Sequence, residues 1–275
     1  MQVDISDVFD LNKIMNSGQC FRASKYDDDT YRFIFRKNIL YIKKLPLNNT
    51  RYEVSCSPSD WNSIWIPYFN LDRNYNSIAE QIPDSDRFSR KCEQYSRGIR
   101  ILKQDHFEML ISFIISQRKS IPAISKSIEL ICERFGTPII TEKKTIYSFP
   151  RPVDLAKASI EELNECKLGY RSEYVKKAAE DVASGKIDLV ALEQLDDEQL
   201  FESLKSFLGV GDKVANCVAL FAYSRTSLAP VDTWIKKVID KEYAGNNPFP
   251  AYGKIAGVIQ QYIFYYAQMH KSEFD

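Results

Sequence analysis

The sequence predicts an α+β protein in which a small N-terminal antiparallel β-sheet is followed by a mostly α-helical, two-lobed region. Two observations support this fold class. Apolar residues alternate with polar ones through residues 30–43, as they do in half-buried strands. Beyond about residue 69 they recur every three or four positions, which is the helical period. With 275 residues, of which 44% are hydrophobic, the chain can bury one large core or two small ones.

The first 68 residues contain the expected strands. In TYRFIFRKNILYIK, residues 30–43, the alternation runs on both sides of Lys37 and Asn38 and predicts a β-hairpin. RYEVSCS at 51–57 predicts a further strand. We therefore place a sheet region at 1–68 and a helical region at 69–275, in which residues 136–152 form a long connection.

Charge and cysteine content narrow the class of protein. The 37 basic residues balance the 37 acidic ones, so any surface for a polyanion must be local. The chain has no apolar run that could span a bilayer and no signal peptide, which predicts a soluble, cytoplasmic protein. The six cysteines form no CxxC pair and are expected to be free thiols. His106 and His270 are too isolated for a catalytic zinc site, and we expect structural or surface roles for both.

Residues 197–224 predict two helices joined by a short glycine turn, DEQLFESLKSF-LGVG-DKVANCVALFAY. Gly209 and Gly211 would let the backbone turn with positive φ and would leave amide groups bare at the start of the second helix. Such amides suit a phosphate. The glycines alone favour an ordinary helix–helix turn over a phosphate site.

A lysine and an aspartate accompany this hairpin. Lys213 lies in the first turn of the second helix, where the helix dipole disfavours a cation, and Cys217 follows on the same helical face. A solvated lysine and a core cysteine are the alternatives. Asp232, in LAPVDTW, stands at the expected start of another helix, where an aspartate caps backbone amides. A capping side chain can also face a cleft, so both roles can hold together.

LGVGDKVANCVALF followed by APVDTW resembles the helix-hairpin-helix, Gly/Pro-Asp DNA glycosylases, and the lysine resembles that of their bifunctional members. The chain is similar to the 8-oxoguanine DNA glycosylase/lyases in four further segments: NSGQCFR (16–22), ISFIISQRKSI (111–121), LGYR (168–171) and GVIQQYIF (257–264). The similarity runs from about residue 8 to residue 269. It implies a base-excision repair enzyme that flips 8-oxoguanine out of duplex DNA, removes it through a lysine Schiff base and nicks the strand by β-elimination.

The resemblance also implies roles for individual residues. Lys213 is the implied nucleophile, and Asp232 stabilises positive charge on the sugar. Four residues are implied to bind the flipped base, the main-chain carbonyl of the first accepting the N7 hydrogen that guanine lacks: Gly18, Cys217, Gln260 and Phe264. Four more are implied to fill the vacated space or reach the opposite base, with the tyrosine as the wedge: Gln117, Arg118, Tyr170 and Arg171. The turn glycines, Gly209 and Gly211, are implied to bind DNA phosphate.

The same resemblance implies that duplex DNA containing 8-oxoguanine is the partner of a monomeric enzyme without a metal in its chemistry. The C-x6-C-x2-C-x5-C run that holds an iron–sulfur cluster in sister glycosylases is absent from the sequence. A monovalent cation that bridges the hairpin amides to a phosphate remains compatible with the motif.

Two departures from the family pattern bear on the opposite base. Gln117-Arg118-Lys119-Ser120 replaces an Asn-rich loop, and Ala123 stands where relatives place a second arginine for the orphaned cytosine. Recognition of that cytosine then depends on Arg171 alone, which predicts weak discrimination among opposite bases. A third departure, Trp234, replaces a histidine that contacts phosphate in several relatives.

Three other functions compete with this interpretation. A non-catalytic helix-hairpin-helix module that grips DNA needs neither Lys213 nor Asp232. A glycosylase for an alkylated purine or an oxidised pyrimidine does not account for the four base-binding residues. A helical interaction scaffold accounts for the apolar periodicity but for none of the polar positions.

Overall fold

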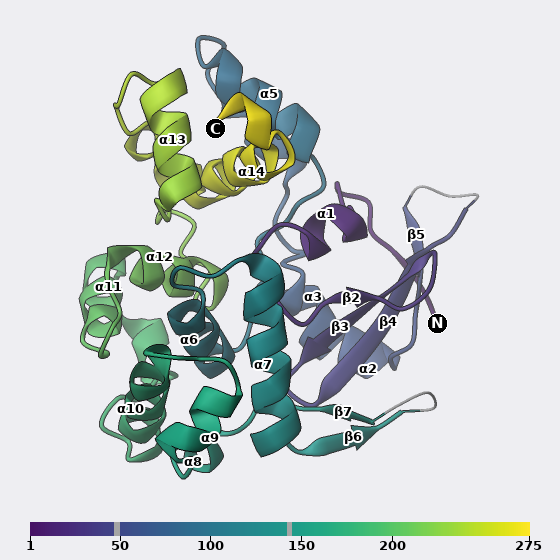
Figure 1. The fold of residues 1–275 in the computed structure, drawn as a ribbon. Coiled ribbons are helices and arrows are strands. Elements are labelled where there is room, and N and C mark those ends of the chain that lie inside the picture. Colours follow the sequence, from purple (N-terminus) through teal and green to yellow (C-terminus); the bar gives the residue numbers. More distant parts are fainter. Residues whose placement is uncertain (47–49, 142–144) are drawn as a thin grey trace. The chain divides into compact units, whose positions relative to one another are not determined.

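The computed structural model describes residues 1–46, 50–141 and 145–275 (Figure 1). It divides into two compact units. The first, which we call the sheet unit, comprises Met1–Phe33, Leu40–Lys103 and Ser224–Asp275. The second, the central unit, comprises Ile34–Ile39 and Gln104–Tyr223. The last helices of the chain thus belong to the same unit as the N-terminal sheet. The predicted division into 1–68 and 69–275 places them in different regions.

The predicted N-terminal sheet is present and has five strands in the order β1-β5-β4-β3-β2. The strands are β1 (Gln2–Asp4), β2 (Ser24–Lys25), β3 (Thr30–Phe35), β4 (Asn38–Lys44) and β5 (Arg51–Val54). The β1–β5 and β4–β5 pairs are antiparallel, with Val3 opposite Tyr52 and Lys43 opposite Glu53. The expected hairpin is confirmed, but it turns at Arg36 and Lys37, one residue early, because Arg36 takes the left-handed φ of 56°.

An aromatic cluster packs against this sheet and contains Phe33, Trp65, Tyr68 and Phe69. The ring of Phe33 lies edge-on to Phe69, with the centroids 5.0 Å apart, and Tyr68 and Phe69 repeat this geometry at the same distance. Trp65 ends a π-turn (Trp61–Trp65), Tyr68 ends α3 (Ile66–Tyr68), and Phe69 is the C-cap of α3. The short helix α2 (Pro58–Asp60) leads into the π-turn. Continuous helical structure from Pro58 therefore precedes the expected boundary at residue 69, as does the short helix α1 (Leu11–Met15).

Elsewhere in the sheet unit, α14 (Ala256–Met269) lies against α5 (Arg87–Ser96) and α13 (Thr233–Glu242) (Figure 1). Its sequence AGVIQQYIFYYAQM is apolar on most sides, as expected for a helix enclosed by neighbours. The unit also contains α1 (Leu11–Met15), α4 (Asn76–Glu80) and the 3-10 turns Phe249–Ile255 and Lys271–Glu273.

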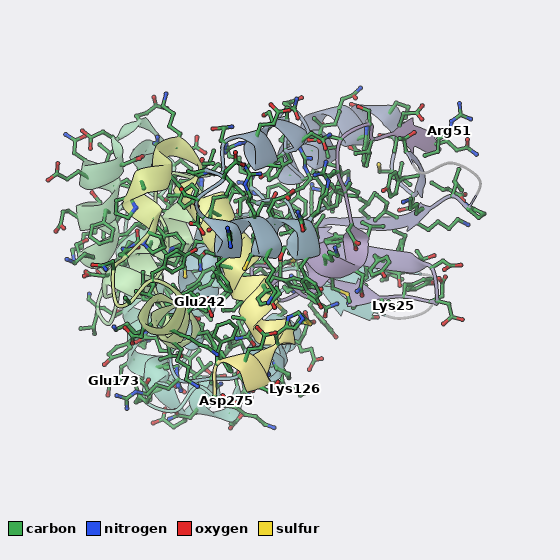
Figure 2. All side chains as sticks on the ribbon, turned by 90° about the horizontal axis from the view of Figure 1, so that it is seen from above. Lys25, Arg51, Lys126, Glu173, Glu242 and Asp275 are labelled. Carbon is green, nitrogen blue, oxygen red and sulfur yellow. The ribbon has the colours of Figure 1, made fainter. Side chains whose placement is uncertain are left out.

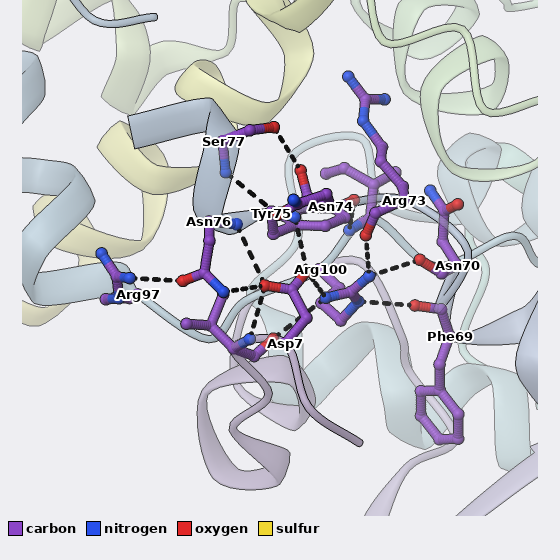
Figure 3. Close-up of polar contacts among 12 residues, drawn as sticks. Asp7, Phe69, Asn70, Arg73, Asn74, Tyr75, Asn76, Ser77, Arg97 and Arg100 are labelled. Atoms are coloured by element: carbon purple, nitrogen blue, oxygen red, sulfur yellow. Dashed lines mark hydrogen bonds and ion pairs between the residues drawn. The ribbon is translucent and has the colours of Figure 1, made fainter. Parts of the chain in front are cut away.

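A buried arginine ties the N-terminal segment to the sheet unit (Figure 3). The side chain of Arg100 has no exposed surface, and its guanidinium lies 2.8 Å from a carboxylate oxygen of Asp7. The other N–H groups of Arg100 donate to main-chain carbonyls: Val8, Phe69, Asn70 and Arg73. Asp7 in turn accepts hydrogen bonds from the backbone amides of Tyr75 and Asn76. Arg100 belongs to RFSRKCEQYSRGIRILK, a stretch rich in basic residues at 87–103, yet its side chain is buried inside the fold.

The central unit is built around α6 (His106–Ile115), every residue of which is buried. It contacts α7 (Ile121–Phe135), α10 (Arg171–Ala183) and α12 (Asp212–Phe221). The other helical elements are α8 (Pro152–Leu155), α9 (Ile160–Glu165), the 3-10 turn Ala191–Gln194 and α11 (Asp197–Lys205).

The connection expected at 136–152 is instead partly ordered as strands. Pro138–Ile140 (β6) pairs antiparallel with Thr145–Tyr147 (β7), with Ile139 opposite Ile146. The centre of the connection, residues 142–144, lies outside the described residues. The sequence predicted a connection here but not its strands, because strands of three residues are too short to show an alternating pattern.

The surface charges, the cysteines and the histidines are arranged as the sequence predicts. Exposed side chains of both signs are mixed (Figure 2), among them Lys25, Arg51, Lys126, Glu173, Glu242 and Asp275. All six cysteines are free, as expected, and all except Cys56 are buried. His106 stacks on Tyr223 and His270 on Tyr266, which is consistent with structural roles. Among the described residues, no helix is both long and apolar enough to cross a membrane.

Candidate functional site

The structure confirms a pair of helices joined by a glycine turn at 206–211. Helix α11 begins with a capping box between Asp196 and Gln199, and α12 begins at Asp212. Gly209 has a φ of 79°, as predicted for the turn. Gly211 has a φ of −101° and precedes the first residue of α12. The prediction of positive φ was therefore wrong for Gly211. This glycine is the N-cap of α12, and it has no side chain that could bond to the first amides of the helix.

Gly209 is required by its surroundings as well as by its φ. A Cβ atom at this position would meet three atoms of the Tyr174 ring, the farthest at 2.7 Å. We expect Gly209→Ala to lower the free energy of unfolding by roughly 2–4 kcal/mol, because left-handed strain and overpacking add together. Gly211→Ala, where no atom lies within 4 Å of the added Cβ, is the matched control and should cost less than about 1 kcal/mol. Urea unfolding of the two variants measures the difference, and equal losses would contradict it.

Lys213 is the second residue of α12, and its amine contacts Phe113 of α6 and Ser116, which directly follows α6. Lys213 Nζ donates to Ser116 Oγ at 3.2 Å and lies 5.3 Å from the centroid of the Phe113 ring. The Ser116 hydroxyl donates its own hydrogen to the Phe113 carbonyl at 2.7 Å, which leaves its lone pairs for the lysine. The amine is thus directed along a defined line instead of extending freely into solvent.

Cys217 follows Lys213 by one turn of α12 and is buried, as both the functional and the packing interpretation expect. Phe221, one turn further, stacks on Phe113 with the ring centroids 5.5 Å apart. Lys213 and Phe221 therefore contact the same aromatic ring, from opposite ends of α12.

Two further loops of the central unit join the glycine turn through Gln117. The Gln117 side-chain amide donates to the Gly209 carbonyl at 3.1 Å, and the Gln117 carbonyl accepts from Arg171 Nε at 2.8 Å. Arg118, the next residue, is exposed and has a left-handed φ of 50°. The loops 116–120, 168–171 and 206–211 thus form one connected surface.

Tyr170 and Arg171, at the start of α10, differ in exposure. Tyr170 is 52% exposed, which suits a wedge side chain. Arg171 is buried, with its guanidinium 4.4 Å from the centre of the Tyr170 ring and bonded to the carbonyls of Gln117 and Leu168. An arginine that contacts an opposite base has to exchange some of these bonds for the base.

The connected surface is locally basic. Lys119 Nζ donates to Ser127 Oγ and to the Lys167 carbonyl. Burial, and then repulsion from Arg171 and Lys167, lowers the pKa of Lys119. These three cations create a local positive field in a chain of zero formal charge, which is what a phosphate-binding surface requires.

The remaining predicted site residues lie in the sheet unit. Asp232 is the N-cap of α13, and its carboxylate accepts from the Ile235 amide at 2.8 Å, which confirms the capping role. Gln260 is buried in α14, and its side-chain oxygen has no hydrogen-bond partner among the described residues. Phe264, one turn further, is half-buried. Gly18 lies in the loop after α1 with a φ of 76°.

The structure therefore groups the predicted residues by unit. The central unit contains Gln117, Arg118, Tyr170, Arg171, Gly209, Gly211, Lys213 and Cys217, and the sheet unit contains Gly18, Asp232, Gln260 and Phe264. Sequence reasoning missed two contacts, those of Ser116 with Lys213 and of Gln261 with the Gly18 loop. Both residues stand beside a predicted site residue, but no spacing rule identifies partners so far apart in the chain.

Comparisons with known proteins agree with this geometry. The family model for the N-terminal domain of 8-oxoguanine DNA glycosylase matches residues 2–110, and that of the HhH-GPD superfamily of base excision DNA repair proteins matches 111–256. The fold is similar to the crystal structure of Clostridium acetobutylicum 8-oxoguanine glycosylase/lyase bound to double-stranded DNA with cytosine opposite 8-oxoguanine. The TM-score is 0.90 with 31% identity, over 98% of each chain.

Two characterised or named proteins are similar to the chain in sequence. The probable N-glycosylase/DNA lyase of Methanothermobacter thermautotrophicus is 30% identical over 202 residues, and the N-glycosylase/DNA lyase of Saccharomyces cerevisiae is 33% identical over 192. The alignments cover 63% and 65% of this chain, but 64% and 50% of the relatives, so the chain spans less than two thirds of their length. With two family matches that meet end to end and a fold shared over nearly its whole length, the chain belongs to the 8-oxoguanine DNA glycosylase family, within the HhH-GPD superfamily of base excision DNA repair proteins.

Proposed function

We propose that the protein is a bifunctional DNA glycosylase and lyase that removes 8-oxoguanine from duplex DNA and then cleaves the strand. The observation that carries this proposal is the position of Lys213 at the start of α12, directly after the glycine turn, with its amine on Ser116 and Phe113. A module that only grips DNA through this turn has no need for an oriented amine. Family membership supports the same activity.

In the proposed reaction the neutral amine of Lys213 attacks C1′ of the damaged nucleotide. The N–C1′ bond forms as the glycosidic bond breaks, and the bonding electron pair leaves with the base, which takes up a proton. Opening of the sugar ring then gives a Schiff base on Lys213. Loss of a C2′ proton expels the 3′ phosphate and nicks the strand.

Asp232 is proposed to stabilise the positive charge that develops on the sugar and to assist proton transfer. Its carboxylate is fixed as the N-cap of α13. A fixed carboxylate needs little rearrangement when charge develops, and this is the basis of electrostatic catalysis. An amine and a carboxylate suffice for these steps, so we propose that the reaction requires no metal or iron–sulfur cluster. A monovalent cation at the hairpin amides would contribute to DNA binding and not to the reaction.

The proposed base pocket reads a guanine-type edge. The buried side-chain oxygen of Gln260, which has no partner in the described part of the chain, requires a hydrogen-bond donor, and a guanine offers N1–H and N2–H donors on its Watson–Crick edge. Phe264 and Cys217 are proposed to contact the two faces of the purine. The Gly18 carbonyl is proposed to accept the N7 hydrogen that only the oxidised base carries.

A panel of duplexes tests the proposal. Otherwise identical duplexes carry 8-oxoguanine, 3-methyladenine, thymine glycol or undamaged guanine, and chromatography measures released base while gel electrophoresis measures strand cleavage. We expect free 8-oxoguanine together with nicked strand. Release of another base in its place would favour a glycosylase of different specificity, and binding without release would favour the non-catalytic module.

Weak opposite-base discrimination is expected from Arg171 and Ala123. The Arg171 guanidinium is bound to main-chain carbonyls, and Ala123 supplies no second cation. Single-turnover excision rates of 8-oxoguanine opposite C, T, G and A should therefore differ by less than about tenfold, the equivalent of about one hydrogen bond. A preference for cytosine of a hundredfold or more would contradict the prediction.

A further inference from the structure

The loop that contains Gly18 is held from both sides by glutamine side chains. On one side, Gln261 Nε2 of α14 donates to the Ser17 carbonyl. Both residues are buried, Gln261 with 2% and Ser17 with none of its surface exposed. On the other side, Gln19 Nε2 donates to the Arg100 carbonyl at 2.9 Å, and Gln19 Oε1 accepts from the Leu102 amide at 2.8 Å.

These bonds leave Gly18 little freedom. The Ser17 carbonyl and the Gly18 amide belong to one planar peptide, so the bond from Gln261 fixes the plane that precedes Gly18. Ser17 is fixed further, because its hydroxyl donates to the Ile14 carbonyl at 2.7 Å and accepts from Gln19 Nε2 at 2.8 Å. Glycine is the residue with the widest conformational freedom, so the direction of the Gly18 carbonyl has to be imposed by its neighbours.

We propose that Gln261 is a positioning residue that sets the direction of the Gly18 carbonyl and, through it, the selectivity for 8-oxoguanine over guanine. This inference rests on the proposed function, in which a single hydrogen bond to that carbonyl separates the two bases. A carbonyl that could rotate would lose the bond to the N7 hydrogen of 8-oxoguanine. It would also turn away from the N7 lone pair of guanine, and the penalty against the normal base would disappear.

Two consecutive residues of α14 then have complementary tasks. Successive residues of an α-helix point about 100° apart, so Gln260 and Gln261 address different surroundings. Gln260 offers the base an oxygen that is unpartnered among residues 1–46, 50–141 and 145–275, whereas Gln261 holds the loop whose carbonyl contacts N7 of the base. One buried helix thereby fixes two of the proposed base contacts relative to each other.

Gln261→Met tests this role, because it keeps the length of the side chain and removes the amide donor. The excision rate of 8-oxoguanine in single turnovers should fall by about 10- to 100-fold, the equivalent of one buried hydrogen bond. Selectivity against guanine should fall with it. Cleavage of a duplex with a preformed abasic site involves no base recognition and should change by less than about twofold. Gln268→Met, the same exchange in the same helix outside this network, is the matched control.

A second variant separates a positioning role from a packing role by its pH profile. In Gln261→Glu the side chain keeps its shape but can donate only when the carboxyl is protonated. Excision by this variant, expressed relative to wild type, should therefore rise as the pH is lowered from 8 to 5. A defect in packing alone would leave this ratio constant.

The outcomes distinguish the inference from the function on which it rests. Equal loss of excision and abasic-site cleavage in Gln261→Met would overturn the positioning role and make Gln261 a structural residue. Unchanged excision and selectivity would also overturn it. Wild-type protein that cleaved abasic sites without releasing 8-oxoguanine would overturn the proposed function and the inference together, and this result is recognised before any variant is compared.

Discussion

Lys213→Gln is expected to abolish the covalent adduct that borohydride traps between the protein and a duplex carrying 8-oxoguanine opposite cytosine. Glutamine lacks a nucleophilic amine, so no Schiff base forms, and base excision should fall by at least about 10³-fold. Denaturing gel electrophoresis detects the adduct as a band of reduced mobility. The contact of Lys213 with Ser116 lies at the end of a buried helix that the substitution leaves in place, and the variant should still bind the duplex.

Lys126→Gln is the matched control, because Lys126 is exposed on α7 and has no part in the proposed site. It should trap as much DNA as the wild type. An adduct that persisted in Lys213→Gln would place the nucleophile on another amine. Release of base by the wild type without any adduct would instead indicate a monofunctional glycosylase.

Arg100→Met should lower the free energy of unfolding by about 3–5 kcal/mol, as breaking a buried ion pair does. The substitution leaves the Asp7 carboxylate without its cation and removes the hydrogen bonds that Arg100 donates to four main-chain carbonyls, of which only that of Asn70 keeps a main-chain donor, the Arg73 amide, among the described residues (Figure 3). Urea unfolding followed by circular dichroism measures the loss. Arg151→Met, which removes the exposed pair with Asp154, is the control and should leave the unfolding midpoint almost unchanged.

The pH dependence of stability provides a second measure of the Arg100 network. Burial alone would raise the pKa of Asp7, but hydrogen bonds from the Tyr75 amide and from Arg100 outweigh it, and the pKa is lowered. A lowered pKa contributes stability that is present above the unfolded value, about 4, and is lost as the pH falls through the folded value. The difference in the free energy of unfolding between wild type and Arg100→Met should therefore become smaller below about pH 4. If the free energy of unfolding changed with pH in the same way in both proteins, Arg100 would have no effect on the pKa of Asp7.

The sequence was sufficient for elements whose pattern is local. The two helices of the glycine turn, the cap at Asp232 and the β3–β4 hairpin all follow from residues close together in the chain. The grouping of α13 and α14 with the N-terminal sheet could not be predicted, because an apolar helix does not specify which neighbour covers it. The β6–β7 pair was missed because three-residue strands carry no periodicity.

The candidate site divides in the same way. The positions of Lys213 and Cys217 on α12 and of Gln260 and Phe264 on α14 could be predicted, since one-turn spacing places each pair on one helical face. Their roles remain predictions. Ser116 and Gln261 could not be predicted, because their partners lie 97 and 244 residues away in the chain. The buried state of Arg171 also depends on a distant loop, that of Gln117.

The free thiols bear on the conditions under which such an enzyme would work. Its proposed substrate arises when DNA is oxidised, and the same oxidants attack cysteine thiolates. Burial raises the pKa of Cys56, Cys92 and Cys166, so these sulfurs remain in the less reactive thiol form. A fold without disulfides, whose cysteines are mostly enclosed, neither depends on a redox bond nor presents many targets to peroxide. The proposed repair activity would thus persist under the oxidative stress that produces its substrate.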